Sequence, residues 1–298
     1  MSRERFLGFK SWVLAGFLLS AIVLGAAGTR IVAGPSSMKW ERDYDKAIAR
    51  AQAEKKLIIA DMFTDWCALC KDMDRETFGD SKVIQTMADK YVWLKLNTET
   101  EEHGERLQQE FAILTYPTVL VLDGSGEEVD RVDRFLGPSQ FMEKVRSFVD
   151  SPNSLAHLRK ALREQPNSVA AHYALAEKLL DQNNYAKARP EFEKVIEIDP
   201  ENREGKTDLS HYNVALCLAS QERFVEAIIQ LDLLKDRFPR SNAIADATVL
   251  RGQIYRCCNE LDKAKAALRE YVTKYPTQGH IQEVENLLAA MEAETKGK

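Results

Sequence analysis

The sequence predicts two folded parts: an α/β domain built on a mixed sheet and, after it, an all-α array of repeated helix pairs. Three observations support this fold class. Strand-like apolar runs alternate with helical stretches as far as Asp150 and then stop. From there to the end, a two-helix pattern occurs three times. The length of 298 residues exceeds that of one typical domain and suits two.

The N-terminal segment is basic and then apolar. Residues 1–10 carry three basic side chains against one acidic side chain, and residues 11–28 include a charge-free run of 17 residues, 12–28. That length lies at the low end of the roughly 17–25 residues of a membrane-spanning helix and above the roughly 7–15 of a signal-peptide core. An uncleaved anchor, which we favour, and a cleaved export signal both place the rest outside the cytoplasm. We therefore expect a periplasmic or other extracytoplasmic protein, anchored in the inner membrane, with residues 29–39 as a linker.

The composition limits the ligands that can be expected. A net charge of −5 and a pI near 5.7, without a basic stripe, argue against nucleic-acid binding. The histidines are scattered and no second Cys-x-x-Cys motif is present, so we expect no metal site. Five cysteines in a chain of this length are too few for a disulfide framework. They comprise one close pair and three further thiols: Cys67, Cys70, Cys217, Cys257 and Cys258.

Within residues 40–150 the pattern predicts helices that alternate with strands. Helices are expected at 44–55, from the cysteine pair to 77, and at 81–87, 105–111 and 138–149. Strands are expected at 57–63, 91–96, 118–122 and 128–134. The last two are joined by Asp-Gly-Ser-Gly at 123–126, a turn signal, and so form a hairpin. Such an order implies a mixed sheet with helices on both faces.

The cysteine pair lies where the strand at 57–63 passes into a helix. This position puts the thiol of Cys67 at the positive end of the helix dipole, where the thiolate, the reactive form in disulfide exchange, is stabilised. We favour a redox-active pair. A purely structural disulfide and a zinc site are the alternatives, and the scarcity of further ligands makes zinc the weaker of the two.

Between Asp61 and Lys71 the chain reads Asp-x-x-x-x-Trp-Cys-x-x-Cys-Lys, and here it resembles the thioredoxin superfamily. Residues 95–97, Lys-Leu-Asn, are similar to the lysine segment of that family's central strand, and residues 116–118, Tyr-Pro-Thr, to its cis-proline loop. The resemblance is greatest to the C-terminal periplasmic domain of the DsbD-type thiol:disulfide reductases, across about residues 40–150. Further shared positions are 65–67, 77–78, 80 and 123–124.

The resemblance implies a role for each residue of the motif. Cys67 would be exposed and would attack the substrate disulfide, and Cys70, one turn into the helix, would resolve the mixed disulfide. Asp61, on the strand beneath, would be buried and relay the proton of Cys70. The alternative is an exposed aspartate at a sheet edge. Lys95 would pair with Asp61 and tune it, unless it is a solvated strand residue.

The loop residues also receive roles from the resemblance. Pro117 would be cis and hold an extended substrate across the thiols through the free backbone groups of its neighbour, Tyr116. Trp66 would pack beside the pair, with direct substrate contact as the alternative. Because no histidine lies between the cysteines, we expect a reduction potential of about −270 mV, like that of thioredoxin, rather than about −120 mV.

The expected activity is that of a protein-disulfide reductase or electron carrier with no cofactor beyond the redox-active disulfide Cys67–Cys70. By the resemblance, its partners would be disulfide-containing envelope proteins and an upstream membrane thiol-electron transporter. This chain has no multi-span domain to act as that transporter.

After a connecting helix at 151–165, residues 166–277 contain about three repeats of a helix pair. The second helices align through Ala188, Ala227 and Ala264, which are 39 and 37 residues apart, and each alanine is followed twelve residues later by a proline. This pattern resembles the tetratricopeptide repeat, whose period is 34 residues. The whole chain is therefore expected to be an α/β thioredoxin-like domain followed by an all-α tetratricopeptide-repeat solenoid.

Stacked repeats of this kind expose a concave groove lined by the first helix of each unit, and residues 278–298 would supply a capping helix and a tail. By the repeat register, we expect the groove to contain Tyr173, Glu177, Tyr212 and Arg256 and to bind a protein or peptide. The array would then recruit the partner that the first domain reduces. The alternative is a non-catalytic envelope adaptor that acts through the repeats alone.

Overall fold

The computed structural model describes residues 37–277 and 279–296, and the expected signal or anchor at 11–28 lies outside them. The elements of the first part are β1 (Trp40–Glu41), α1 (Tyr44–Glu54), β2 (Ile58–Phe63), α2 (Ala68–Asp72), η1 (Met73–Phe78), α3 (Ser81–Met87), β3 (Val92–Asn97), α4 (Glu102–Glu110), β4 (Thr118–Leu122), β5 (Glu128–Val132) and α5 (Pro138–Asp150). Those of the second part are α6 (Leu155–Glu164), α7 (Val169–Asp181), α8 (Tyr185–Ile198), α9 (Thr207–Ser220), α10 (Phe224–Arg237), α11 (Ala243–Cys257), α12 (Leu261–Lys274) and α13 (Ile281–Lys296).

These elements follow the predicted pattern, with three differences. The strand β1 is not predicted, because a two-residue segment carries no periodic signal. Helix α4 begins at Glu102, three residues before the predicted start. The helix after Cys67 extends about as far as predicted, to Phe78, but its second half, η1, is a π-helix, a form that occurs frequently at functional sites.

The strands form one mixed sheet in the order β1-β3-β2-β4-β5. Strands β1, β3 and β2 are parallel, whereas β4 runs antiparallel to β2, and β5 to β4. The hairpin turns at the predicted segment, where the Asp123 carboxylate accepts hydrogen bonds from the backbone of Ser125 and Glu127. Gly126 has a φ of 85°, a left-handed conformation that glycine adopts without a steric penalty. The prediction of a mixed sheet that ends in a hairpin is confirmed.

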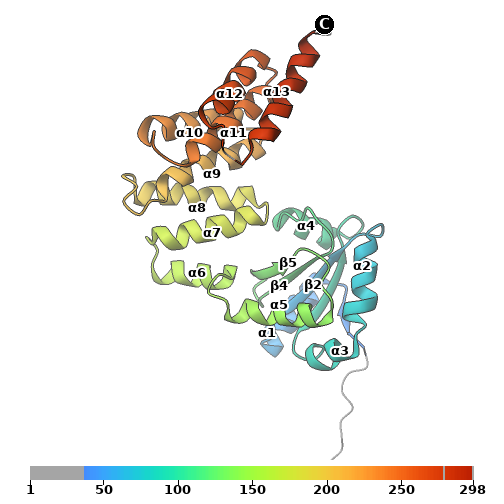
Figure 1. The fold of residues 1–298 in the computed structure, drawn as a ribbon. Helices are drawn as coiled ribbons and strands as arrows, with labels where there is room; N and C mark the ends of the chain where they lie inside the picture. The colour runs from blue at the N-terminus through green and yellow to red at the C-terminus, as the bar shows by residue number, and fades with distance from the viewer. Residues whose placement is uncertain (1–36, 278, 297–298) are drawn as a thin grey trace, which may run out of the picture. The chain divides into compact units, whose positions relative to one another are not determined.

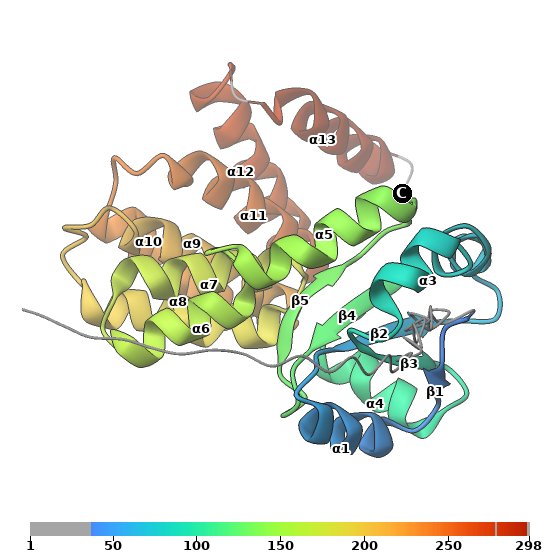
Figure 2. The same ribbon diagram turned by 90° about the horizontal axis from the view of Figure 1, so that it is seen from below.

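Helices cover both faces of the sheet, as predicted, with α1 and α4 on one side and α3 and α5 on the other (Figure 2). Successive side chains of a strand point to opposite faces. In β2, Ala60 packs with α1 and α4, whereas Ile59 packs in the opposite cluster with Met73 of η1. By the same alternation, Asp61 points to the side of Ile59. The sequence of β2 therefore places Asp61 beneath the helix that carries the cysteines.

The second part consists of stacked antiparallel helix pairs, α7 with α8, α9 with α10 and α11 with α12, preceded by α6 and followed by α13 (Figure 1). Two features recur in all three pairs. The first helix carries a small buried residue: Ala176, Ala215 and Gly252. The turn between the helices contains a left-handed residue, with φ of 57°, 59° and 59°: Asn183, Glu222 and Asn259. These shared features confirm three copies of one two-helix unit.

Helix α6 packs along the edge strand β5, and a charged side chain from each of α6 and α7 binds this strand. The guanidinium of Arg159 donates to the backbone carbonyl of Glu128 at 2.6 Å, and the ammonium of Lys178 lies 2.9 Å from the carboxylate of Asp130. The Glu128 carboxylate is buried and accepts hydrogen bonds from Arg131 at 2.5 and 2.8 Å. Because its edge is covered, β5 is buried along its whole length, although most of its residues are charged.

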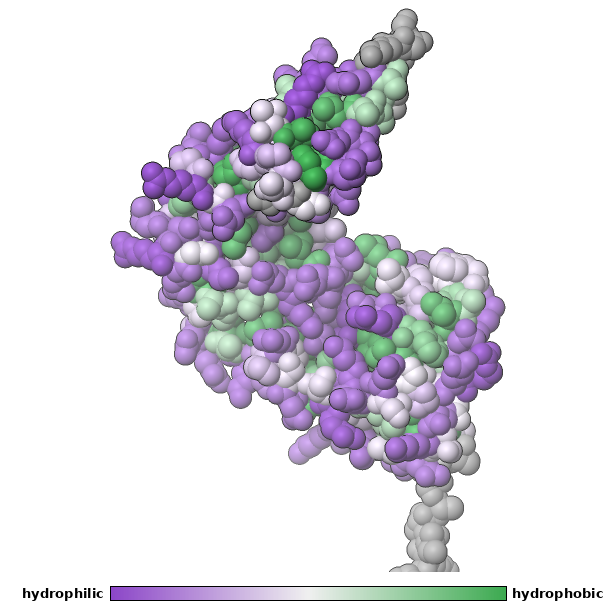
Figure 3. All heavy atoms as spheres, viewed as in Figure 1, coloured by the Kyte–Doolittle hydropathy of each residue, from purple (hydrophilic) through white to green (hydrophobic). Residues whose placement is uncertain are grey.

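Among residues 37–277 and 279–296, we find no helical segment with the length and hydropathy that crossing a bilayer requires. The face drawn in Figure 3 is mostly hydrophilic, with separate hydrophobic patches. Within the same residues, the large apolar side chains gather mainly in four buried clusters, two against the sheet and two among the helix pairs.

Candidate functional site

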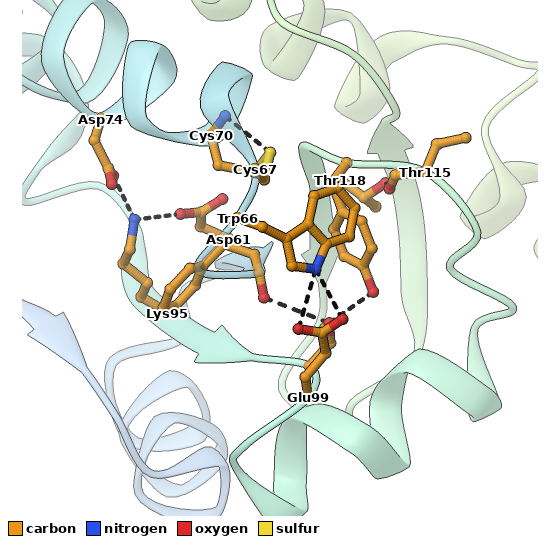
Figure 4. Close-up of a disulfide and its surroundings, with 12 residues drawn as sticks. Asp61, Trp66, Cys67, Cys70, Asp74, Lys95, Glu99, Thr115 and Thr118 are labelled. Carbon is orange, nitrogen blue, oxygen red and sulfur yellow. Dashed lines mark hydrogen bonds and ion pairs between the residues drawn. A yellow bond between two sulfur atoms is a disulfide. The ribbon is translucent and has the colours of Figure 1, made fainter.

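Cys67 and Cys70 form a disulfide at the start of α2 (Figure 4). Cys67 is the N-cap residue, and its sulfur accepts a hydrogen bond from the backbone N–H of Cys70 at 3.0 Å. This N–H group and the helix end favour negative charge on the sulfur of Cys67. The sequence predicts an exposed Cys67, but only 4% of the residue is accessible. Its sulfur is bonded to that of Cys70, one turn into the helix.

Asp61, Lys95 and Asp74 form an ionic cluster close to the disulfide (Figure 4). Asp61 and Lys95 are both buried, and the Lys95 ammonium lies 2.6 Å from Oδ2 of Asp61 and also contacts the half-exposed carboxylate of Asp74. Asp61 and Lys95 are register partners on the parallel strands β2 and β3, so their side chains share one face. The predicted burial of Asp61 and its pairing with Lys95 are confirmed, whereas Asp74 is not predicted.

Burial raises the pKa of Asp61 to about 6, and the positive charge of Lys95 only partly offsets this effect. The Oδ1 atom of Asp61 accepts no hydrogen bond from any described residue. In Figure 4 the carboxylate lies between Lys95 and the cysteine pair. An ionised carboxylate with a free acceptor oxygen and a pKa near neutrality is suited to take the proton of the Cys70 thiol.

The raised pKa predicts a pH-dependent cost to folding. The folded protein keeps the Asp61 proton up to about pH 6, whereas the unfolded chain releases it near 3.8. Stability should therefore fall between about pH 4 and 6, by up to roughly 3 kcal/mol for a shift of about two units, and stay lower above that range. In Asp61→Asn this decline should be absent, and Lys95 keeps Asp74 as a partner. The measurement is urea unfolding of both oxidised proteins from pH 4 to 7. Parallel curves would show that Asp61 does not titrate in this way.

The loop that leads into β4 lies beside the cysteine pair (Figure 4) and contains the predicted cis bond, between Tyr116 and Pro117. The hydroxyl of Tyr116 shares a hydrogen bond with Thr98 at 2.6 Å and accepts one from Gln108 at 2.9 Å. These bonds hold the Tyr116 ring, which meets the indole of Trp66 nearly at a right angle, with ring centres 5.9 Å apart. The two rings connect the cis-proline loop to the cysteine motif.

Three large apolar residues of the motif and the loop remain exposed: Trp66 (67%), Leu69 (51%) and Leu114 (67%). The sequence predicts that Trp66 packs beside the pair. Its indole N–H donates to both carboxylate oxygens of Glu99, at 2.9 and 3.1 Å, and the ring stays largely accessible. Exposed apolar groups that gather near a reactive bond suit contact with a protein segment. Leu69 and Leu114 are not predicted, although Leu69 stands between the two cysteines and Leu114 lies two residues before the motif at 116–118.

Of the four residues predicted to line the repeat groove, three share a hollow of about 490 Å³: Tyr173, Glu177 and Tyr212. Arg256 does not line this hollow. The repeat spacing places Gln253 at the position equivalent to Glu177, and Arg256 lies nearly one turn farther on, exposed at the end of α11.

The three remaining cysteines are free, as predicted. Cys217 is buried in the first helix of the second pair, and burial raises the pKa of its thiol to about 12, which makes it unreactive. Cys257 and Cys258 are exposed. Among the described residues, no group of three or more histidine, cysteine, aspartate or glutamate side chains could hold a metal ion.

Two family models match the chain. One, described as thioredoxin-like, covers residues 39–124, and the other, described as a tetratricopeptide repeat, covers residues 153–207. The first match contains the disulfide, and the second contains the first of the helix pairs. The chain combines a thioredoxin-like domain with tetratricopeptide repeats. Both resemblances inferred from the sequence are confirmed.

The thioredoxin-like domain is similar to thiol:disulfide interchange proteins named DsbD. The chain is 30% identical to the protein from Pseudoalteromonas atlantica over 110 residues and 29% identical to the one from Escherichia coli over 111 residues. The matches cover 36% and 37% of this chain but only 18% of each relative. The chain thus spans less than a fifth of the length of these relatives, and its thioredoxin-like domain is of the thiol:disulfide oxidoreductase type.

Two solved structures also resemble parts of the chain. The oxidised C-terminal domain of Neisseria meningitidis DsbD aligns over 37% of this chain and 98% of that domain, with 21% identity and a TM-score of 0.32. MamA from Desulfovibrio magneticus RS-1, from residue 41 to its end, aligns over 53% of this chain and 85% of that chain, with 19% identity and a TM-score of 0.42.

Proposed function

We propose that this protein is an exported thiol:disulfide oxidoreductase that reduces disulfides in other proteins, and that its tetratricopeptide repeats recruit those proteins. The observation that carries the proposal is the setting of the Cys67–Cys70 disulfide. It lies at a helix start, beside a cis-proline loop and close to the buried Asp61 carboxylate, which has one free acceptor oxygen. Each of these parts has a task in disulfide exchange.

In the proposed reaction, the reduced Cys67 thiolate attacks one sulfur of the substrate disulfide and forms a mixed disulfide, and the other substrate sulfur leaves as a thiolate that takes a proton. The Cys70 thiol gives its proton to Asp61 and attacks the Cys67 sulfur, which releases the second substrate sulfur. Two electrons pass from the pair to the substrate, and the protein is left with the disulfide described here. We expect an upstream membrane thiol-electron transporter to reduce it again.

The surroundings of the disulfide suit an extended protein substrate. The backbone of Tyr116, next to the cis bond to Pro117, would align the substrate segment, and the exposed side chains of Trp66, Leu69 and Leu114 would receive its apolar groups. Apolar contact of this kind gives affinity without a strict sequence requirement, which suits an enzyme with several client proteins.

The sequence supports the proposed direction and location. The residues between the cysteines, Ala68 and Leu69, offer no charge that would hold the reduced thiolate strongly, so a donor of electrons is favoured over a strong oxidant. The basic residues 1–10 and the apolar residues 11–28 favour export and anchoring in the inner membrane. Disulfide-containing envelope proteins are the expected clients.

The reduction potential of the pair tests this proposal. It is measured in dithiothreitol and glutathione buffers on the chain with Cys257→Ser and Cys258→Ser, because these exposed thiols would otherwise contribute. We expect a value near −270 mV, roughly that of thioredoxin. A value near −120 mV, roughly that of a strong oxidant, would reverse the proposed direction. A pair without a redox transition would instead support a non-catalytic adaptor that acts through the repeats.

A further inference from the structure

A continuous groove runs along the first helices of the repeats. One hollow, of about 490 Å³, is lined by residues of α7, α9 and the start of α11, and a second, of about 290 Å³, by residues of α9, α11 and α13. Tyr212 and Asp246 line both hollows, so the two form one surface. A groove of this extent can hold several residues of an extended chain, at about 3.3 Å per residue.

The charged side chains that line this groove are almost all acidic. They include Glu177, Asp181, Asp246 and Glu283, while neither hollow is lined by a lysine or an arginine. The first three are exposed and form no ion pair with a described residue, and Glu283 contacts His280 at 3.2 Å. The groove therefore carries negative charge that the described part of the chain leaves largely uncompensated.

The two tyrosines of the groove lie within this negative potential. Burial is the largest cause of the raised pKa of Tyr173, and the carboxylates of Glu177 and Asp208 raise it further. Burial and the carboxylate of Asp246 raise the pKa of Tyr212. A carboxylate close to each ring makes the surface unfavourable for an anion and favourable for a cation.

One amine of the chain itself shows how the groove accepts a cation. The ammonium of Lys206 lies 4.4 Å from the centre of the Tyr173 ring, a distance at which an aromatic face attracts a cation. Tyr212 is the equivalent residue of the next repeat, 39 positions on. Leu180 and Leu209 add apolar surface between these rings, which suits the aliphatic stem of a long basic side chain.

We propose that this groove binds an extended segment of a partner protein that carries lysine or arginine side chains. The inference deepens the recruitment role proposed above and rests on it for the partner's identity as a client of the disulfide site. The basic head groups would pair with Glu177, Asp181 and Asp246. Their stems would lie on Tyr212 and on Leu180 and Leu209, because Lys206 already covers the nearly buried ring of Tyr173. An acidic segment would be repelled by these carboxylates, whose charge Lys206 offsets only in part, and this disfavours it.

The test uses a dye-labelled peptide of about nine residues in which lysine and alanine alternate, and the same peptide with glutamate in place of lysine. Binding to the full chain is measured by fluorescence anisotropy at low salt and at about 0.5 M salt. We expect the lysine peptide to bind, salt to weaken it, and the glutamate peptide not to bind. A triple variant, Glu177→Gln, Asp181→Asn and Asp246→Asn, should bind the lysine peptide at least about tenfold more weakly.

A matched triple variant removes the same charge from the second helices: Glu193→Gln, Glu197→Gln and Asp236→Asn, all exposed and outside the groove lining. It should bind like the original chain. Equal binding of both peptides, or equal weakening by both triple variants, would overturn the inference. If a variant fails to fold, the inference is still tested on the unmodified chain, by the salt dependence of binding and by the comparison of the two peptides. The reduction potential distinguishes failure of this inference from failure of the proposed function. A redox-active pair without peptide binding would refute only the proposed peptide specificity of the groove. Peptide binding without a redox transition would refute only the proposed oxidoreductase activity.

Discussion

Replacing Cys67 by serine should abolish disulfide reduction. The change removes the sulfur at the N-cap of α2, which accepts the hydrogen bond from Cys70 and would carry the attacking thiolate. A serine hydroxyl cannot form a mixed disulfide, so no other group at the helix start can take over the first step. The rate of insulin reduction with dithiothreitol as the electron source should therefore fall to that of the uncatalysed reaction.

Cys70→Ser is the matched control, because it changes the same atom type one turn into the same helix. This variant should also stop turnover, but for a different reason. Cys67 can still attack the substrate disulfide, and the mixed disulfide then accumulates because no resolving thiol is present. Residual turnover in Cys67→Ser well above background, or equal accumulation of mixed disulfide in both variants, would contradict the order of attack.

The second large effect concerns the fold next to the site. Gly104→Ala should destabilise the protein by roughly 3 kcal/mol or more. An added Cβ would lie 2.0 Å from the backbone oxygen of Asn97 and 3.1 Å from the Cα of Thr98, and backbone atoms cannot swing aside. Helix α4 would have to move away from β3. The hydrogen bonds that Asn97 makes to Asp65 and Thr98 to Tyr116, near the disulfide, would be disturbed as well.

Gly137→Ala provides the comparison, because an added Cβ there has no atom within 4 Å. Gly137 is the N-cap of α5, so the change should cost at most about 1 kcal/mol through a poorer cap. Urea unfolding of both variants measures the difference. A Gly104→Ala protein as stable as Gly137→Ala would mean that α4 does not approach the end of β3 this closely.

Much of the candidate site follows from the sequence because short stretches of chain position it. Asp61, Cys67 and Cys70 lie within ten residues, so one strand-to-helix junction places all three. Lys95 joins them because β3 is the parallel neighbour of β2. Asp74 could also have been found, since it follows Cys70 by four residues, about one helical turn, and so returns to the same side of the helix.

The exposure of side chains is harder to predict, because it depends on segments far away in the chain. Glu128 and Asp130 read as ordinary surface charges in a hairpin strand. They are buried because Arg159 of α6 and Lys178 of α7 contact β5. The local sequence pattern of β5 does not predict these contacts. Cys67 differs in the same way, because its position at a helix start predicts exposure whereas the residue is buried.

The residues of the repeat groove could be predicted from the sequence only in part. Periodicity correctly placed Tyr173, Glu177 and Tyr212 on one surface, because stacked copies of a unit present equivalent positions side by side. Arg256, which the same reasoning placed in the groove, does not line the hollow that these three residues share. The acidic character of the surface emerges only when residues from successive first helices are brought together by the fold.

The most direct test of the account is to locate the mixed disulfide. The full chain with Cys70→Ala, Cys257→Ser and Cys258→Ser keeps only Cys67 and the buried, unreactive Cys217. It is reduced, treated with oxidised glutathione and digested, and the modified peptide is identified by mass spectrometry. We expect a stable glutathione adduct on Cys67, and no adduct in the matched chain that retains Cys70, because Cys70 displaces it. A Cys67 without an adduct, or an adduct equally stable when Cys70 is present, would contradict thiol–disulfide exchange by this pair.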